Sequence, residues 1–295
     1  MKSKNKGGIA MIVLCSILIL LGLVVLIVSP IAGGVAVLGG ISGIIYGIKS
    51  RKRYKEEIQA AEEKRAADEA ARKAEAERKA EKMCEFAEAL DAIPRVEVAR
   101  SEELARRRKD QFFPKLMNVT ARTNIDGLFP LVVVDVETTG LKPQKDDIIE
   151  VSAIKYNKPF EPDSCFTTLC KPRSFIPVEA SRINHITDAM VEDSPAFSEI
   201  AASLSEYIRG CNILGHCVDF DTGFLYSCGV ELPDEKYYDT CELARLILKG
   251  LDNYKLPTLC AHYDIVRNDA HRSLSDAYAT ALVFERLIRD RRARS

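Results

Sequence analysis

The sequence predicts an α/β domain in the C-terminal half of the chain, preceded by a transmembrane helical hairpin and a long charged helix. Residues 131–134 form a short, fully apolar, β-branched run, which is typical of a buried strand. Two uncharged runs lie near the N-terminus, and a stretch made almost entirely of Ala, Glu, Lys and Arg follows them. The 295 residues leave room for one substantial domain and this additional material.

The first uncharged run covers residues 9–28, and these twenty residues match the ~20 that a helix needs to cross a bilayer. Ser29 and Pro30 separate it from a second, glycine-rich run at residues 31–48. A signal peptide is the alternative, but its apolar region is usually only ~7–15 residues long, and the second run would stay unexplained. Residues 1–53 are therefore predicted to be a membrane anchor with two transmembrane helices.

The orientation of this anchor follows from its basic flanks, because positively charged flanks stay in the cytoplasm. The flanking residues are Lys2, Lys4, Lys6, Lys49, Arg51, Lys52 and Arg53. Nine cysteines without a repeated Cys-x-x-Cys pairing, several among apolar residues, also indicate a reducing compartment. The prediction is a multi-pass protein of the inner or plasma membrane, with its C-terminal domain facing the cytoplasm.

A repeat of small residues predicts how the second apolar helix packs. Gly39, Gly43 and Gly47 recur every four residues and fall on nearly one face. Small residues allow helices to approach closely in lipid. The partner is either the first helix of the same chain or the same helix of a second chain, which would give a homo-oligomer.

Residues 54–93 are strong helix formers and predict one long charged helix, which Pro94 ends. No Leu or Ile seam repeats, so a single solvated helix fits better than a coiled coil. Residues 94–127 are a charged connector whose basic cluster, residues 106–109, is better explained as a solvated helix face than as a lipid or nucleic-acid contact. Neither segment has an apolar face large enough for the domain core, so a fragment beginning near Asn124 is expected to fold alone.

Residues 128–290 form the predicted domain, and its first strand ends in two acids. Asp135 and Glu137 are two residues apart, so both side chains point to one face of the strand. They stand at its C-terminal end, the usual place for a site in an α/β sheet. Thr138, Thr139 and Gly140 then form a turn whose backbone can come close to a phosphate or sugar.

Two further segments carry the remaining candidates. Residues 212–215 are a second short apolar run that ends at His216, and Asp221 opens the helix that follows. Asp219 is a nearby competitor, but Asp221 directly precedes the apolar pair of this helix. His271 lies just before the last helix, with Asp276 about one turn further on.

Carboxylates gathered in one pocket repel one another, and a hard divalent cation with oxygen ligands stabilises them. His271 is then a candidate base for an attacking water. Taken singly, each residue has an ordinary explanation: a solvated strand end, a helix-start acid or a surface histidine. Together, the residues favour a metal-dependent reaction on a phosphate.

The segments LVVVDVETTG, ILGHCVDFDTGFL and HRSLSDAYAT resemble, in order, the three motifs of the DEDDh, or DnaQ-like, 3′→5′ exonucleases. This family includes the proofreading subunit of bacterial replicative DNA polymerases. INHITDAMVEDSPAF also resembles the family's stretch between the first two motifs, and the resemblance covers about residues 128–290. Two positions depart from the common pattern: Cys217 stands where the family usually has Asn, and Asn184–His185 where His-Gly is frequent.

The resemblance implies a ribonuclease H-like mixed sheet flanked by helices. It implies that His271 is the general base and that two Mg²⁺ or Mn²⁺ ions are held by Asp135, Glu137, Asp221 and Asp276. The residues expected to contact the substrate are Thr138, Thr139, Gly140, Leu141 and His216.

The net charge of −1 excludes a strongly basic nucleic-acid binder but not an enzyme with a local site. The prediction is a membrane-anchored, metal-dependent 3′→5′ exonuclease that releases nucleoside monophosphates from nucleic-acid 3′ ends, with DNA favoured over RNA. A non-catalytic module that binds nucleic-acid ends, or a membrane scaffold, is the alternative. Neither alternative requires all five residues of the predicted catalytic set.

Overall fold

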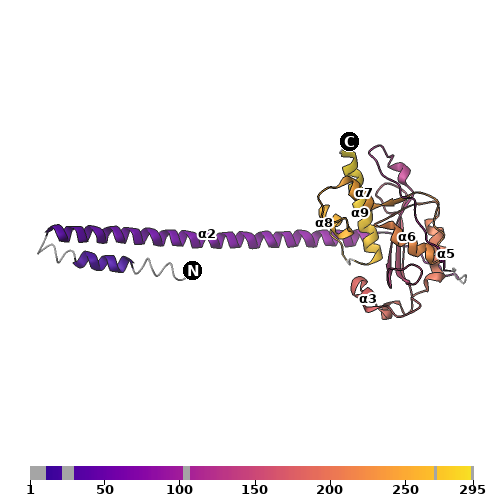
Figure 1. Cartoon of the computed structure of the whole chain (residues 1–295), viewed down its shortest axis with the longest axis horizontal. Coiled ribbons are helices and arrows are strands. Elements are labelled where there is room, and N and C mark those ends of the chain that lie inside the picture. The colour runs from indigo at the N-terminus through magenta and orange to yellow at the C-terminus, as the bar shows by residue number, and fades with distance from the viewer. Residues whose placement is uncertain (1–10, 22–29, 102–106, 269–270, 294–295) are drawn as a thin grey trace. The chain divides into compact units, whose positions relative to one another are not determined.

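The computed structural model describes residues 11–21, 30–101, 107–268 and 271–293 (Figure 1). Their contacts divide the chain into two units, Met1–Arg78 and Lys79–Ser295. Helix α2, Pro30–Asp91, runs through the boundary between these units without a break. Each unit is described by itself below.

The first unit contains a short helix, residues 11–21, and the greater part of α2. Gly40 and Gly43 lie against the short helix, because a Cβ at these positions would collide with Ile19 and Cys15. The glycines therefore allow the two helices to approach within the chain. The surroundings of Gly39 and Gly47 lie outside what the structure describes. The predicted homo-oligomer through this face is unsupported.

The membrane prediction is not upheld. Among the residues described, no helix combines the length and the apolar composition that crossing a bilayer requires. Residues 9–10 and 22–28 of the first uncharged run, and the side chains at 31–39 of the second, lie outside what the structure describes, and the described part of the first run is helical over residues 11–21. The prediction of a multi-pass protein of the inner or plasma membrane with a cytoplasmic-facing domain is therefore wrong, and membrane is unsupported as a partner.

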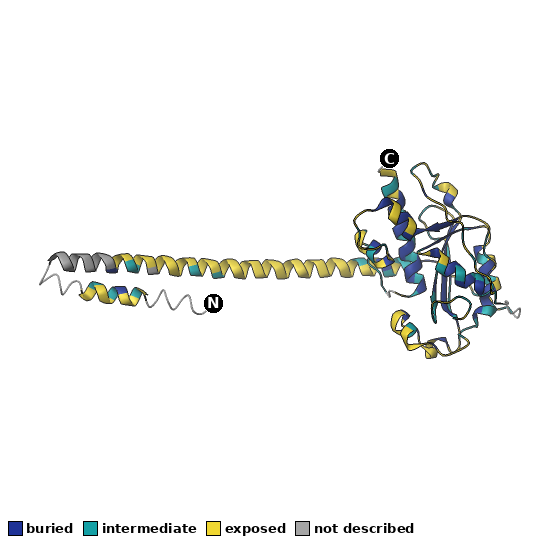
Figure 2. Ribbon diagram, viewed as in Figure 1, coloured by how far each residue is buried: buried dark blue, intermediate teal, exposed yellow. Residues whose placement is uncertain are grey.

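The middle of α2 is exposed to solvent over nearly all of residues 51–81 (Figure 2). Ala, Glu, Lys and Arg have high helix propensity, so this stretch can be helical without packing against other segments. In exposed ion pairs such as Lys52–Glu56 and Lys73–Glu77, the two partners lie one helical turn apart. This part of α2 is a solvated helix.

The second unit is built on one mixed sheet of five strands in the order β3-β2-β1-β4-β5. Strand β1 is antiparallel to β2 and parallel to β4, β2 is antiparallel to β3, and β4 is parallel to β5. The strands are β1 Leu131–Thr138, β2 Ile148–Tyr156, β3 Ser164–Leu169, β4 Asn212–Gly215 and β5 Tyr237–Asp239. The predicted α/β class with a mixed sheet is confirmed.

Helices cover both faces of this sheet, with α5 and α6 on one side and α7 to α9 on the other (Figure 1). The alternation of β1 explains the two layers: Leu131 and Val133 pack with α9, and Val132 and Val134 pack with α5 and α6. The helical segments are η1 Asp126–Leu128, α3 Val178–Asn184, α4 Asp188–Val191, α5 Phe197–Ile208, α6 Val218–Ser227, α7 Thr240–Ile247, α8 Leu256–His262 and α9 Ser273–Ala293.

The end of α2 and the connector belong to the core of the second unit, contrary to the sequence-based expectation. Phe86, Ile93 and Val119 are buried together with the α9 side of the sheet. Phe86 has Leu90 four residues further on, and Val119 follows Phe112, Leu116 and Met117, but the interpretation of these stretches rested on their charged residues. A fragment beginning near Asn124 would lack all three side chains.

The connector also covers both edges of the sheet. Val96 N donates to Cys165 O on β3 at 2.9 Å, and Met117 N donates to Tyr237 O on β5 at 2.7 Å. An uncovered edge strand presents free backbone groups that pair with other chains. The connector therefore satisfies backbone groups on both outer strands.

Residues 107–109 of the connector's basic cluster make contacts within the second unit, in a segment without regular secondary structure rather than on a helix face. Arg107 donates to Asp147 Oδ1 at 2.8 Å and to Pro143 O at 2.7 Å, and the Arg108 guanidinium lies 4.4 Å from the centre of the Tyr226 ring. These contacts attach the connector to the loop that follows β1 and to α6.

Candidate active site

Asp135 and Glu137 lie at the C-terminal end of β1, on the face that packs against α9. They share this face because side chains two residues apart in a strand point the same way, and Leu131 and Val133 precede them on it. Asp276 lies in the first turn of α9 and is buried. The pairing of β1 with α9 therefore brings two separate motifs together.

Asp221 reaches the same end of the sheet from α6. Strand β4 is parallel to β1, so both strands end at the same edge, and α6 starts just beyond β4. Asp221 is buried, and its Oδ1 accepts a hydrogen bond from Val136 N at 3.0 Å. Asp219, in the same helical turn, is exposed.

The four carboxyl groups disfavour one another's charge. Burial, followed by Asp221 and Asp276, raises the pKa of Asp135 well above its usual value. Burial, followed by Asp276 and Glu150, raises the pKa of Glu137 to about 8. Burial also raises the pKa values of Asp221 and Asp276. Low dielectric and like charge act in the same direction here.

Two neighbours modify the environment of Asp276. Arg267 pairs with its Oδ1, and this guanidinium opposes the effect of burial on the Asp276 pKa. The backbone N–H of His271 donates to its Oδ2 at 3.3 Å. His271 has a positive φ of 64°, precedes α9 by two residues and is exposed.

A fifth acid, Glu150, adjoins the site and was not predicted from the sequence. It pairs with Glu137 in the β1–β2 register and is buried. Its carboxylate accepts hydrogen bonds from Arg272 Nη2 at 2.6 Å and from Ser273 N at 2.8 Å. An acid inside the apolar run of β2 is the signal that would have drawn attention to it.

The turn after β1 is tightly bonded. Thr138 Oγ1 donates to Gly140 O at 2.6 Å, and Asp147 N donates to Thr139 Oγ1 at 2.9 Å. A Cβ at Gly140 would collide with the Asp146 carboxylate, so only glycine fits without movement. Leu141, next in the chain, is 81% exposed. An exposed leucine beside a tight turn offers an apolar surface to a ligand.

A cleft of about 580 Å³ adjoins these residues and contains Asp135, His271 and Asp276 in its lining. His216 also lines it, half-buried, with Nδ1 2.8 Å from Thr240 Oγ1. Burial lowers the pKa of His216 to about 4, so its imidazole is neutral at pH 7. Cys217 and Cys241 line the same cleft, which therefore brings residues of β1, α7, α9 and the β4–α6 junction together.

The carboxylates suit a hard cation. Their oxygens are the ligands that Mg²⁺ and Mn²⁺ prefer, and a divalent ion would relieve the repulsion that raises their pKa values. They are not the tightest group of potential ligands. Among the described residues, His216, Cys217 and Cys241 alone form a group of three His, Cys, Asp or Glu side chains whose ligand atoms all lie within 4.8 Å.

A mixed α/β sheet with half-buried and buried carboxylates gathered at one edge, and a histidine in the adjoining cleft, is an arrangement suited to a metal-dependent hydrolase. Comparison with known proteins identifies the family. The sequence model of the Exonuclease family matches residues 132–284, and the chain belongs to this family. The family match falls within residues 128–290, for which an exonuclease domain was predicted.

Two curated relatives are named as a DNA polymerase subunit and as an exonuclease. The DNA polymerase III subunit epsilon of Treponema pallidum is 34% identical over 160 residues, which are 52% of this chain and 74% of that protein. The 3′-5′ exonuclease DinG of Bacillus subtilis is 34% identical over 158 residues, 52% of this chain but 17% of that protein. The chain thus matches only a part of some relatives, and its other half is matched by neither of these two proteins.

Solved structures with a similar fold include exonuclease X in complex with 5′ overhanging duplex DNA, at 23% identity and a TM-score of 0.44, covering 54% of this chain and 91% of that one. Exonuclease I of E. coli in complex with a dT13 oligonucleotide has 22% identity and a TM-score of 0.48, covering 56% of this chain and 42% of that one.

Proposed function

We propose that this chain is a divalent-metal-dependent 3′→5′ exonuclease, which releases nucleoside monophosphates from the 3′ ends of DNA. The convergence of Asp135, Glu137, Asp221 and Asp276 at one edge of the sheet carries the proposal, because these carboxylates disfavour one another's charge and a bound divalent cation would relieve that repulsion. The family and the names of the relatives support the type of reaction. DNA is favoured as the substrate because the polymerase subunit and the exonuclease complexes are named for DNA.

The four carboxylates would hold two ions, Mg²⁺ or Mn²⁺. When bound, such ions supply positive charge beside the reacting phosphate. Arg267 already pairs with Asp276 and lines the cleft, so it neutralises part of the acidic charge that a phosphate strand would meet.

His271 is proposed to accept the proton of the attacking water. His271 is exposed and lines the cleft, and its backbone N–H is bonded to Asp276, so this residue stands beside the carboxylates. The water oxygen bonds to the terminal phosphorus, and the bond from that phosphorus to the 3′ oxygen of the preceding nucleotide breaks. That oxygen takes a proton, which leaves a nucleoside 5′-monophosphate and a strand one nucleotide shorter.

The tight turn after β1 is proposed to hold the terminal nucleotide. Thr138, Thr139 and Gly140 bring backbone close to the site, and the exposed Leu141 offers a face on which a base can stack. His216, neutral and half-buried on the cleft wall, is the other proposed substrate contact.

A nuclease assay with strands labelled at either end tests the proposal. With Mg²⁺ or Mn²⁺, a 3′ label should leave as a mononucleotide, while a 5′ label should remain on a ladder of shortening strands; chelator should stop both. His271→Ala should cut the rate by roughly 10²–10⁴-fold with metal binding retained. Asp135→Asn should weaken metal binding as well as turnover.

The neighbouring acids of α6 supply a matched control. Asp221→Asn should abolish most activity, whereas Asp219→Asn should leave it near the parent level, because Asp219 is exposed. Endonucleolytic products, or equal losses in the two variants, would contradict the assignment. Matched RNA strands in the same assay measure the preference for DNA.

A further inference from the structure

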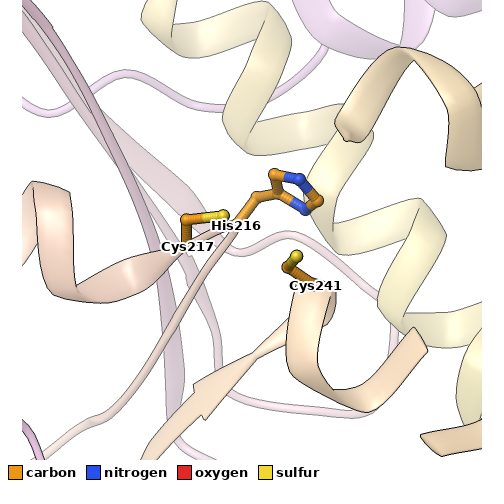
Figure 3. Close-up of side chains that lie close together, drawn as sticks. All are labelled: His216, Cys217 and Cys241. Atoms are coloured by element: carbon orange, nitrogen blue, oxygen red, sulfur yellow. The ribbon is translucent and has the colours of Figure 1, made fainter. Parts of the chain in front are cut away.

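A second group of side chains in the cleft has a different ligand chemistry from the carboxylates. Ligand atoms of His216, Cys217 and Cys241 all lie within 4.8 Å of one another (Figure 3). All three residues line the cleft that contains Asp135 and His271. Imidazole and thiolate suit Zn²⁺, whereas Mg²⁺ and Mn²⁺ prefer the oxygen ligands of the carboxylates.

One buried carboxylate, that of Asp239, holds the backbone segments of Cys217 and Cys241 next to each other. Asp239 Oδ2 accepts from Val218 N at 2.8 Å, and its Oδ1 accepts from Cys241 N at 2.7 Å and Glu242 N at 3.1 Å. Asp239 thus joins the start of α6, directly after Cys217, to the start of α7, which contains Cys241. A site built at the ends of regular elements is held more firmly than one on a free loop.

The third side chain is also held in place. His216 follows β4, the strand that pairs in parallel with β5, and Gly215 lies opposite Asp239 in this pairing. Thr240 Oγ1 lies 2.8 Å from His216 Nδ1 and also donates to Gly215 O at 3.2 Å. Metal-binding histidines usually have a hydrogen-bonding partner of this kind, which orients the ring.

The spacing needs little adjustment for zinc. Zn–S bonds of about 2.3 Å and Zn–N bonds of about 2.0–2.1 Å place tetrahedral ligand atoms about 3.4–3.8 Å apart. The ligand atoms are at most 4.8 Å apart, so they have to approach one another by about 1 Å. Side-chain rotation allows this movement. Cys217 is exposed and Cys241 is buried, so an ion can enter from the cleft and bind against its wall.

We propose that His216, Cys217 and Cys241 bind one Zn²⁺ ion on the wall of the cleft, at a site separate from the carboxylates. Three protein ligands leave a fourth tetrahedral position open, and water would fill it. The chain would therefore bind two kinds of metal in one cleft: hard ions at the ends of β1 and α9, and a thiophilic ion at the starts of α6 and α7.

Cobalt binding to the full chain tests this site without reference to nuclease activity. The protein is stripped with chelator, kept in a phosphine reductant so that Cys217 and Cys241 stay reduced, and titrated with Co²⁺. One equivalent should give a thiolate-to-cobalt charge-transfer band and the visible bands of tetrahedral Co²⁺. Zn²⁺ should displace this signal, and excess Mg²⁺ should not.

Variants assign the signal to individual ligands. Cys217→Ser and Cys241→Ser should each abolish the charge-transfer band or reduce it several-fold. Cys84→Ser, which removes an exposed thiol on α2, and Asp135→Asn should both leave it intact. Cys217→Asn introduces the residue that exonucleases of this family usually have, so it keeps the fold while removing the thiol.

Absence of a thiolate band in the reduced parent would overturn the proposal. A band that persists in Cys217→Asn and in Cys241→Ser would overturn it equally, since the signal would then come from other thiols. Visible Co²⁺ bands that appear without a thiolate band and are lost in Asp135→Asn would show that the ion binds at the carboxylates instead. Because the readout is binding, failure here is distinguishable from failure of the proposed exonuclease reaction.

Discussion

At the scale of single residues, Glu137 shows how the cost of the site is distributed. It is half-buried beside Asp276 and opposite Glu150, and its pKa of about 8 means that it is mostly protonated at pH 7. A cation must displace this proton to bind the carboxylate. The acidity of one side chain therefore links metal affinity, stability and pH.

The metal-free protein is expected to lose stability as the pH rises from about 4.5 to about 8. In this window the folded state holds a proton on Glu137 that the unfolded state has released, so the free energy of unfolding falls by up to about 1.4 kcal/mol per pH unit for this one group. Melting temperatures measured with chelator across this range should decline more steeply in the parent than in Glu137→Gln. Saturating Mg²⁺ should flatten the decline.

A melting temperature that declines more steeply with pH in Glu137→Gln than in the parent would contradict this account. If Glu137→Gln declined as steeply as the parent, the Glu137 carboxyl would not be the titrating group, and Asp135 or Asp221 would have to carry the effect.

Residue patterns in the sequence located the acids but not their partners. Asp135 and Glu137 could be assigned to one face because strand periodicity is local, and Asp221 because the helix start is local. Arg272 lies 122 positions from Glu150, so only the folded sheet reveals that pair. The His216–Cys217–Cys241 group was missed for the same reason, since its members meet through two parallel strands rather than through a Cys-x-x-Cys spacing.

At the scale of elements, the start of α9 is attached to β2. Glu150 accepts hydrogen bonds from both Nε and Nη2 of Arg272, and Ser152 Oγ lies 2.7 Å from Ser273 Oγ. Asp276 lies three residues after Ser273, in the first turn of α9, and His271 immediately precedes Arg272. The contacts with β2 therefore position both Asp276 and His271 in the predicted active site.

Glu150→Gln is expected to destabilise the protein by about 1–3 kcal/mol, since it leaves the Arg272 guanidinium near the core without its charge partner. The value is below that of a fully buried pair, because the Arg272 side chain is 36% exposed. Urea unfolding measures the change. Glu206→Gln, which breaks an exposed pair with Arg209, is the control and should have little effect.

A positioning role adds a kinetic expectation for the same variant. If Glu150 acts by holding α9, Glu150→Gln should lower kcat more than it changes KM, and a stabilising concentration of Mg²⁺ should not restore the rate. Equal stability of Glu150→Gln and the parent would remove Glu150 from this role.

At the scale of the whole molecule, sequence reasoning was reliable where patterns are local and failed where burial depends on distant segments. The solvated helix follows from runs of residue type, and the mixed sheet was implied by the resemblance that three local motifs carry. The membrane prediction rested on apolar composition alone. The connector was expected to lie outside the core, but Phe86, Ile93 and Val119 are buried because the sheet and α9 enclose them.

The point where the chain can be cut is the last consequence of this burial. A fragment beginning at Lys79 keeps the whole second unit and should unfold cooperatively at the temperature of the full chain. A fragment beginning at Asn124 loses Phe86, Ile93 and Val119, each worth about 1.5–3 kcal/mol when fully buried. It also uncovers the edges of β3 and β5, where Val96 and Met117 are bonded.

The shorter fragment is therefore expected to aggregate or to melt at least several degrees lower, whereas the longer one should keep its metal-dependent activity. Calorimetry and size-exclusion chromatography of the two fragments, prepared in parallel, measure the difference.

A full-length chain carrying Phe86→Ala and Val119→Ala separates the two causes, because it loses side chains of the core and keeps both covered edges. If this variant melts with the Asn124 fragment, core burial accounts for the loss. If it is monomeric and only slightly destabilised while the fragment aggregates, the covered edges are the larger contribution. Equal stability of both fragments would show that residues 79–123 pack on the domain without stabilising it.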